Sequence, residues 1–375
     1  MKIPYNKPYM TGKELWYISQ AHANGHLAGD GDFTRKCHAW LENHIGCKKA
    51  LLTHSCTAAL EMAAILIDIA PGDEVIMPSY TFVSTANAFV LRGAVPVFVD
   101  IRPDTLNIDE TKIEEAITEK TKAIIVVHYA GIGCEMDTIM EIAKKHEILV
   151  IEDAAHGIMA SYKGRQLGSI GHLGALSFHE TKNIISGEGG ALLINDARFL
   201  DRAEIVREKG TNRSQFFRGE VDKYTWVDIG SSYLPGELIA AFLWAQMEDA
   251  EIITKRRLQI WDRYHQSLKN LEDQGKVRRP IVPLDCKHNA HLYYLLLEDL
   301  EKRDSFIANL KKKGIGVVFH YVPLDKSPMG DKYGCVSGKL TNTHILSNNL
   351  VRLPLWLGLE DQLEEVIRHV IAVVN

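Results

Sequence analysis

The sequence has no long hydrophobic run and no excess of positive charge. No apolar stretch approaches the roughly 18 residues that span a bilayer, and residues 1–5 lack the apolar core of a signal peptide. Lysine and arginine number 43 against 48 aspartate and glutamate, which gives a net charge of −5. The short cluster at 311–313 is interpreted as a solvated helix end. We therefore expect a soluble, cytoplasmic protein that binds neither membrane nor nucleic acid.

The cysteines and histidines form no recognisable ligand pattern. None of the six cysteines belongs to a C-x-x-C pair, and a chain of 375 residues is large enough to fold without disulfides. The sixteen histidines are scattered, without an H-E-x-x-H array. These absences fit a reducing compartment, and we expect no metal site.

What the chain does contain is an alternation of short apolar, β-branched runs with helical stretches between residues 50 and 195. This alternation predicts one large α/β domain whose mostly parallel sheet is covered by helices on both faces. Helices are expected at 58–67 and 138–146. The seven expected strands are 49–53, 74–77, 95–99, 123–128, 149–152, 175–178 and 191–194.

A second, smaller unit is expected at the C-terminal end. Pro235 and Gly236 precede a long helical pattern over 237–268, which we interpret as the link between the two units. Strand patterns at 293–297 and 316–320 alternate with helical patterns at 303–313 and 360–373, which indicates an α+β unit. The expected domains are residues 1–245 and 246–375.

Polar residues at the ends of these strands favour a site for pyridoxal phosphate (PLP). Such a site needs a lysine for a Schiff base and a carboxylate that keeps the ring nitrogen protonated. Lys182 follows the strand at 175–178, and Asp153 ends the strand at 149–152, where α/β folds bind ligands. Either residue has an ordinary alternative, because isolated lysines are usually on the surface and Asp153 would also suit a helix N-cap.

Further residues would complete such a pocket. The turn at 55–58, including Thr57 and Ala58, opens a helix whose positive end suits a phosphate, although ordinary capping explains it equally well. Ser177 would add a hydroxyl from a neighbouring strand. Phe82 follows another strand and would cover the face of the cofactor ring, or would simply fill the core.

The same segments resemble those of a known family. The sequence resembles the sugar aminotransferases of the DegT/DnrJ/EryC1/StrS family over nearly its whole length. The motifs that carry this resemblance are at 29–31 (GDG), 71–76 (PGDEVI), 78–85 (PSYTFVST), 152–156 (EDAAH) and 177–183 (SFHETKN). The resemblance implies a type I PLP-dependent aminotransferase fold.

The resemblance also implies individual roles. Lys182 matches the Schiff-base lysine, Asp153 the partner of the pyridine nitrogen and Phe82 the stacking aromatic. Thr57, Ala58 and Ser177 match phosphate-binding positions, and His156 stands where many members have a glutamine that contacts the ring hydroxyl. Ser232 replaces an asparagine that reaches the phosphate of a partner subunit, so the contact across the interface is in question, while a homodimer is still expected.

A narrower likeness, in segments 207–219 and 222–226, is to members that act in enterobacterial common antigen synthesis. It implies amino transfer from L-glutamate to C4 of dTDP-4-dehydro-6-deoxy-D-glucose. The candidate substrate-binding residues are Lys209, Arg213, Arg218 and His320, each of which would equally suit a structural role.

Three alternatives remain open. The substrate would be a different 3- or 4-keto sugar nucleotide, the protein would be a sugar dehydratase of the same fold, or it would be a PLP-binding regulator without turnover. The dehydratases carry histidine in place of Lys182, and the presence of both Lys182 and Asp153 favours an enzyme.

Overall fold

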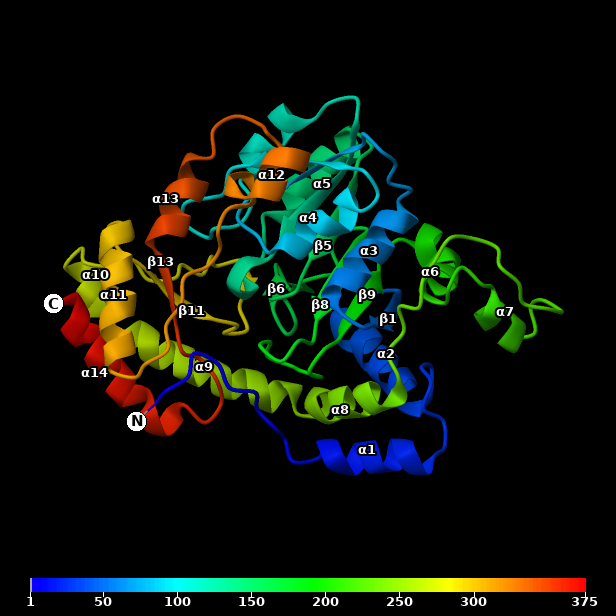
Figure 1. The fold of residues 1–375 in the computed structure, drawn as a ribbon, viewed down its shortest axis with the longest axis horizontal. Coiled ribbons are helices and arrows are strands. Elements are labelled where there is room, and N and C mark those ends of the chain that lie inside the picture. Colours follow the sequence, from blue (N-terminus) through cyan, green and yellow to red (C-terminus); the bar gives the residue numbers. More distant parts are fainter. Residues whose placement is uncertain (1) are drawn as a thin grey trace.

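The computed structural model describes residues 2–375, and its centre is an eight-stranded sheet (Figure 1). All seven predicted strands are confirmed. β9 is antiparallel to both of its neighbours, β1 and β8, and the remaining strand pairs of the sheet are parallel. The eighth strand, β12, comes from the C-terminal part. It consists of two residues, both exposed, so no apolar run in the sequence predicts it. In spatial order the strands are β1 (Lys49–Thr53), β9 (Gly190–Ile194), β8 (Leu173–Ser177), β5 (Leu149–Asp153), β4 (Thr121–Val127), β2 (Glu74–Pro78), β3 (Val95–Val99) and β12 (Cys335–Val336).

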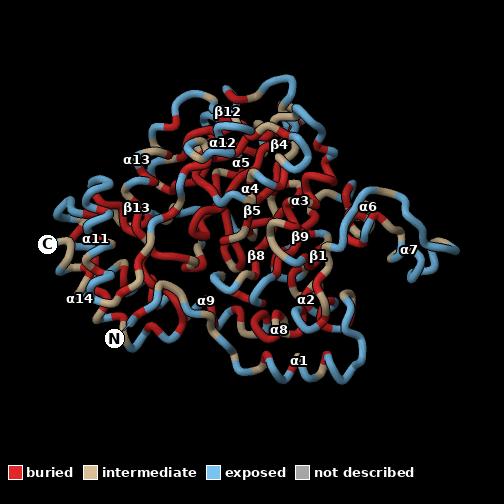
Figure 2. The backbone as a smooth tube through the Cα atoms, viewed as in Figure 1, coloured by how far each residue is buried: buried red, intermediate tan, exposed pale blue. Residues whose placement is uncertain are grey.

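Both faces of this sheet are buried, because successive side chains along each strand enter different apolar clusters. On β1, for example, Leu52 belongs to one cluster and Leu51 to the other. The first cluster includes residues of α2 (Asp32–Ile45), α5 (Met136–Lys145) and α8 (Glu237–Glu248). The second includes residues of α3 (Cys56–Leu66), α4 (Val83–Val90) and α6 (Leu200–Arg207). The predicted α/β layers, with helices on both faces, are therefore present (Figure 2).

The long helix predicted over 237–268 is interrupted. It consists of α8 and α9 (Ala250–Ser267), separated by Asp249 at φ −103° and ψ 11°. The Asp249 carboxylate accepts a hydrogen bond from Lys13 at 2.9 Å, next to α1 (Glu14–Ala23), which lies along α8. Aspartate is a weak helix former, and this pairing outside the helix favours the break. From α8, α9 runs to the C-terminal part (Figure 1).

The C-terminal part contains a small antiparallel pair, β11 (Tyr293–Leu296) and β13 (Leu350–Leu353). The strand predicted at 316–320 is wrong: Val318 forms only an isolated bridge with Arg352. One side of this segment is taken by the N-terminal arm, where Gly316 donates to the carbonyl of Ile3 at 2.8 Å, so no continuous ladder forms. The helices here are α10 (Lys269–Asp273), α11 (Leu300–Lys312), α12 (Pro328–Tyr333), α13 (Thr341–Asn349) and α14 (Leu363–Val374).

The remaining elements are short. The strands β6 (Ser161–Tyr162), β7 (Arg165–Gln166) and β10 (Cys286–Lys287) form a small sheet that the sequence did not predict. Helix α7 (Arg213–Phe217) projects from the body of the molecule on an exposed arm (Figures 1 and 2). Within residues 2–375, no helix combines the length and the apolar character that crossing a membrane requires.

Candidate active site

A cavity of about 610 Å³ lies at the carboxyl ends of the parallel strands. It is lined by turns of the large sheet, by the N-terminal arm and by segments near β11 and β13. Seven of the residues singled out from the sequence line it: Thr57, Phe82, Asp153, His156, Ser177, Lys182 and His320. The position agrees with the general rule that α/β sheets bind ligands beyond the carboxyl ends of their strands.

Lys182 follows β8 in a turn held by the hydrogen bond from its own N–H to the carbonyl of His179, at 2.9 Å. Burial lowers the pKa of its ammonium group, and the positive charge of Arg352 acts in the same direction, while Cys56 and Asp153 oppose the shift. A lower pKa increases the fraction of neutral amine. Lys182 is therefore suited both to attack a carbonyl carbon and to carry a proton.

Asp153 is the last residue of β5, and its carboxylate enters the cavity from the end of the strand. Oδ2 accepts the hydroxyl of Thr85 at 2.7 Å, and Oδ1 accepts the N–H of Ala155 at 3.1 Å. Burial raises the pKa of the carboxyl group, against the opposing effect of these hydrogen bonds and of Lys182. Only a turn follows, with no helix, so the N-cap alternative is wrong. A buried carboxylate of this kind favours a cationic partner.

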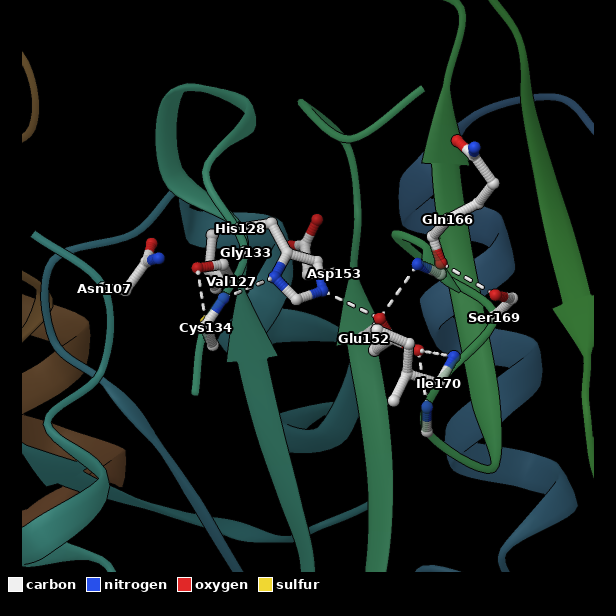
Figure 3. Close-up of polar contacts among 12 residues, drawn as sticks. Asn107, Val127, His128, Gly133, Cys134, Glu152, Asp153, Gln166, Ser169 and Ile170 are labelled. Carbon is white, nitrogen blue, oxygen red and sulfur yellow. Dashed lines mark hydrogen bonds and ion pairs between the residues drawn. The ribbon is translucent and has the colours of Figure 1, made fainter. Parts of the chain in front are cut away.

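The neighbouring residue, Glu152, fixes the end of β5 from the opposite side (Figure 3). Its side chain is fully buried, and one of its oxygens lies 2.8 Å from Nε2 of His128. Because Nδ1 of His128 accepts the N–H of Cys134 at 3.2 Å, Nε2 is the protonated nitrogen and donates to Glu152. The Glu152 carboxylate also accepts three backbone N–H groups, from Gly168, Ile170 and Gly171. The sequence analysis missed this network, which stabilises the strand that carries Asp153.

The turn between β1 and α3 presents small polar groups to the cavity. Ser55 is the N-cap of α3, and its hydroxyl accepts the N–H of Ala58 at 3.1 Å. The N–H of Ala58 is therefore used in capping α3, as the alternative interpretation predicted, and Ala58 does not line the cavity. The hydroxyl of Thr57 lies 2.7 Å from that of Ser84, and both line the cavity together with Ser177. These hydroxyls, beside the positive end of α3, form a surface suited to an anion.

Phe82 lines the cavity although 56% of its surface is exposed. It is the N-cap residue of α4, and its ring centroid lies 6.3 Å from that of Tyr321. The alternative that Phe82 fills the core is therefore wrong. An exposed ring in this position is available to cover a flat ligand.

Three of the four histidines that line the cavity, His156, His291 and His320, are held as neutral imidazoles. The ring of His156 stacks on that of His291 with centroids 4.0 Å apart, and its Nδ1 accepts the N–H of Ala130 at 3.3 Å. Nε2 of His156 is thus the donor nitrogen. Nδ1 of His320 lies 3.1 Å from the hydroxyl of Tyr129. Burial lowers the pKa of His156, His291 and His320 well below the ordinary value, so none of them adds positive charge near pH 7.

Besides Ala58, four predicted residues lie outside this cavity of the single chain. Ser232 is exposed and forms an isolated bridge with Glu208, and Lys209 adjoins that bridge. Arg213 pairs with Glu208 at 2.9 Å, while Arg218 pairs with two other carboxylates, Glu204 and Glu220. Lys209, Arg213 and Arg218 lie on or beside the arm that carries α7, and none of them lines the cavity.

Other cavity residues were not predicted. Tyr5 comes from the N-terminal arm, His291 from the segment before β11 and Arg352 from β13. No motif surrounds any of them. The available signal was an arginine within the apolar run at 350–355, where a charged residue is unexpected unless it has a function.

Comparison with known proteins identifies the family to which the chain belongs. The model of the DegT/DnrJ/EryC1/StrS aminotransferase family matches residues 8–374. The chain belongs to this family. The match spans nearly the whole chain, so the family predicted from the motifs is confirmed.

Individual relatives agree with this result. GDP-perosamine synthase of Caulobacter vibrioides is 34% identical over 325 residues, which are 85% of each chain. The spore coat polysaccharide biosynthesis protein SpsC of Bacillus subtilis is 33% identical over 385 aligned residues, which cover 100% of this chain and 97% of the relative. Among solved structures, the putative sugar aminotransferase Spr1654 of Streptococcus pneumoniae in its PMP form is 27% identical, with a TM-score of 0.92 over 99% of both chains.

The type I fold and the PLP cofactor are thereby confirmed, and the protein is a PLP-dependent sugar aminotransferase. The residues present fit the cofactor: a buried carboxylate, an amine and a set of hydroxyls face one cavity. Gly190 on β9 supports this fit. A Cβ atom there would lie 2.3 Å from the carbonyl carbon of Ser55 and 2.4 Å from the nitrogen of Cys56. Only glycine allows β9 to approach the turn this closely.

Proposed function

We propose that this sugar aminotransferase transfers the amino group of L-glutamate to C4 of dTDP-4-dehydro-6-deoxy-D-glucose. The products would be dTDP-4-amino-4,6-dideoxy-D-galactose and 2-oxoglutarate. The observation that carries the proposal is the convergence of Lys182 and Asp153 on one cavity, together with the sequence likeness of segments 207–219 and 222–226 to enzymes that aminate this sugar. GDP-perosamine synthase, a relative named for a nucleotide-linked sugar, supports the substrate class.

The residues of the cavity divide the chemistry among them. Bound PLP supplies an electron sink that stabilises negative charge on the carbon next to the nitrogen. Asp153 would hold the proton on the pyridine nitrogen by charge and hydrogen bonding. The Thr57 and Ser177 hydroxyls, with the positive end of α3, would bind the phosphate. Phe82 would cover the ring, and Nε2–H of His156 would donate to the ring hydroxyl.

Lys182 moves the protons. In the first half-reaction its amine takes the α-proton of glutamate, and in the second it delivers a proton to C4 of the sugar. The two substrates use the same cavity in turn, which gives ping-pong kinetics. The lowered pKa of Lys182 provides the neutral amine that the first step requires.

The oligomeric state and the surroundings also belong to this proposal. Phe82 and Val83 are exposed beside the cavity, and Leu238 and Ile239 are exposed on α8. Exposed apolar side chains of this size favour a contact with a second subunit. We expect a cytoplasmic homodimer that acts in enterobacterial common antigen synthesis. Ser232, which is shorter than the asparagine that the family has at this position, is the candidate for a contact with the partner's phosphate site. The boundary between the two expected domains, residues 1–245 and 246–375, also remains a prediction.

The experiment is an assay of the purified holoenzyme with L-glutamate and a panel of 3- and 4-keto sugar nucleotides, with product stereochemistry determined by NMR. We expect highest kcat/KM with dTDP-4-dehydro-6-deoxy-D-glucose and an axial amine at C4. A higher kcat/KM with another ketone would contradict the proposed substrate, but the reaction would still be the transfer of an amino group to a sugar. Absence of 2-oxoglutarate with every ketone would favour the regulatory alternative and refute the proposal.

A further inference from the structure

Ser84 and Thr57 present a pair of hydroxyls to the cavity from two different helices. Thr57 lies in the first turn of α3 and Ser84 in the first turn of α4, and their hydroxyl oxygens are 2.7 Å apart. Both residues line the cavity, and both are only partly buried. Among residues 2–375, the hydroxyl of each has the other as its one hydrogen-bond partner. The pair therefore keeps hydrogen-bonding capacity for a ligand.

The ordinary role of a serine at the start of a helix does not account for Ser84. The N-cap residue of α4 is Phe82, whose side chain makes no capping hydrogen bond, and Ser84 is already the second helical residue. Its hydroxyl contacts the neighbouring helix instead of its own. Because Phe82 provides no acceptor, α4 also directs an uncapped, positive helix end toward the hydroxyl pair.

Ser84 has a defined position, because the first turn of α4 is held on two sides. Helix α4 packs against α3. The hydroxyl of Thr85 donates to Asp153 at the end of β5, at 2.7 Å, and Thr81 contacts the same hydroxyl at 2.7 Å. The side chain at position 84 is thus carried by a segment anchored to both the large sheet and the neighbouring helix.

The number of hydrogens determines what the pair can do. Each hydroxyl has one hydrogen and two lone pairs, so one hydroxyl donates to the other and one hydrogen remains free. A phosphate dianion offers only acceptors to these groups. Thr57 belongs to the turn that is assigned to the phosphate in the proposed function. The arrangement that serves this site is a chain in which Ser84 donates to Thr57 and Thr57 donates to the phosphate.

Such a chain makes Thr57 a better donor in two ways. A threonine in a helix divides between two side-chain rotamers, and a donor 2.7 Å from its oxygen selects one of them. A hydroxyl that accepts a hydrogen bond is also more strongly polarised, so its own hydrogen bond is stronger. Because the hydroxyls of Thr57, Ser84 and Ser177 are neutral, their affinity for a dianion depends on how many of their hydrogens point toward it.

We propose that Ser84 is a positioning residue of the cofactor site, which orients the Thr57 hydroxyl toward the phosphate group of PLP. This role rests on the phosphate placement of the proposed function and is independent of the sugar. It extends the phosphate site from the turn before α3 to the first turn of α4. Ser84 therefore acts on the affinity for PLP and not on the proton transfers of Lys182.

The first test measures the dissociation constant of PLP by fluorescence titration of the cofactor-free protein. The control is Ser305→Ala, since Ser305 is exposed on α11 and lies outside the cavity. We expect Ser84→Ala to raise the constant about fivefold, as loss of one hydrogen bond predicts, with the melting temperature of the cofactor-free protein unchanged. Ser84→Thr restores the hydroxyl and should restore the affinity. A constant for Ser84→Ala equal to that of the control, or equal losses for Ser84→Ala and Ser84→Thr, would overturn the proposal.

Ligands that contain only one part of the cofactor show which end of it is affected. Pyridoxal has the ring and the aldehyde without the phosphate, so Ser84→Ala should leave its affinity unchanged. Inorganic phosphate, followed by phosphorus NMR, should bind more weakly by a factor similar to that for PLP. An equal loss of affinity for pyridoxal would assign Ser84 to the placement of the ring and overturn the proposal.

A double-mutant cycle with Thr57→Val distinguishes a chain from two independent donors. We expect Thr57→Val to weaken PLP binding about tenfold or more, and Ser84→Ala to have no further effect in its presence. Additive losses would show that Ser84 donates to the phosphate directly and would overturn the positioning role. If Thr57→Val leaves the affinity unchanged, the phosphate placement in the proposed function is wrong. If Thr57→Val weakens binding and Ser84→Ala does not, that placement stands and Ser84 has no part in it.

Discussion

Asp153→Asn isolates the charge of the residue that ends β5. The asparagine has the same shape, so its side-chain oxygen can still accept the N–H of Ala155. Thr85 also contacts the hydroxyl of Thr81 at 2.7 Å and can rotate to accept from the new amide. The substitution therefore removes the negative charge and little else. We expect it to lower the catalytic rate of the holoenzyme but to maintain or increase the stability of the cofactor-free protein.

In the holoenzyme the effect is a loss of catalysis. Asp153 is buried, and leaving a buried cation without its partner costs about 3–5 kcal/mol. If most of that free energy is lost in the transition state, the rate of the glutamate half-reaction falls by about 10²–10³-fold, since each 1.4 kcal/mol is a factor of ten. Single-turnover absorbance measurements with saturating PLP give this rate directly.

In the cofactor-free protein the substitution should not destabilise. Burial raises the folded-state pKa of Asp153, so the folded protein holds this proton more tightly than the unfolded chain. The carboxyl contribution to stability is then present below the unfolded pKa of about 4 and is lost as the pH rises through the raised folded-state value. At pH 7, Asp153→Asn should keep or increase the free energy of unfolding measured in urea.

Thr85→Val is the control, because it removes one hydrogen bond to the carboxylate and keeps the charge. We expect a decrease in the half-reaction rate of about tenfold for this variant, the lower end of the roughly 1.5–3 kcal/mol that one hydrogen bond to a charged group contributes. A rate for Asp153→Asn equal to that of Thr85→Val would refute the assigned role. So would a destabilised cofactor-free Asp153→Asn protein, because the carboxylate would then be structural.

Three further predictions concern other parts of the site. Lys182→Ala should abolish 2-oxoglutarate formation without changing the melting temperature of the cofactor-free protein, and substantial turnover by the variant would remove Lys182 from the mechanism. In the wild type, borohydride should attach the cofactor to Lys182, as mass spectrometry of peptides would show. Glu152→Ala should lower the free energy of unfolding by about 3–5 kcal/mol, because it leaves buried donors without acceptors, and an unchanged denaturation midpoint would contradict this network. Gly190→Ala should weaken PLP affinity, measured by fluorescence titration, by displacing the turn at Ser55; equal affinity in variant and wild type would show that the turn does not hold the phosphate.

The large sheet could be predicted because its strands are buried on both faces. Their continuous apolar runs, such as residues 123–127 within β4, stand out from the amphipathic helices between them. The polar residues that end these runs, including Asp153, could also be found, since strand ends meet at one edge of a parallel sheet. The predictions were wrong where local pattern does not decide the backbone. Asp249 breaks a continuous helical pattern through a contact with Lys13, and the segment at 316–320 is divided between two distant partners.

The half of the cavity that the sequence analysis missed differs in origin from the half that it found. Lys182, Asp153 and Thr57 each follow a strand of the large sheet, so the position of each can be inferred from its own neighbours in sequence. Tyr5 and Arg352 contact each other from opposite ends of the chain. Their meeting depends on the N-terminal arm pairing beside Gly316, which in turn adjoins the bridge between Val318 and Arg352. Two long-range contacts must form before this side of the cavity exists, and periodicity within a single segment reports neither of them. The shape of the cavity is therefore expected to depend on the N-terminal arm as well as on the strands of the large sheet.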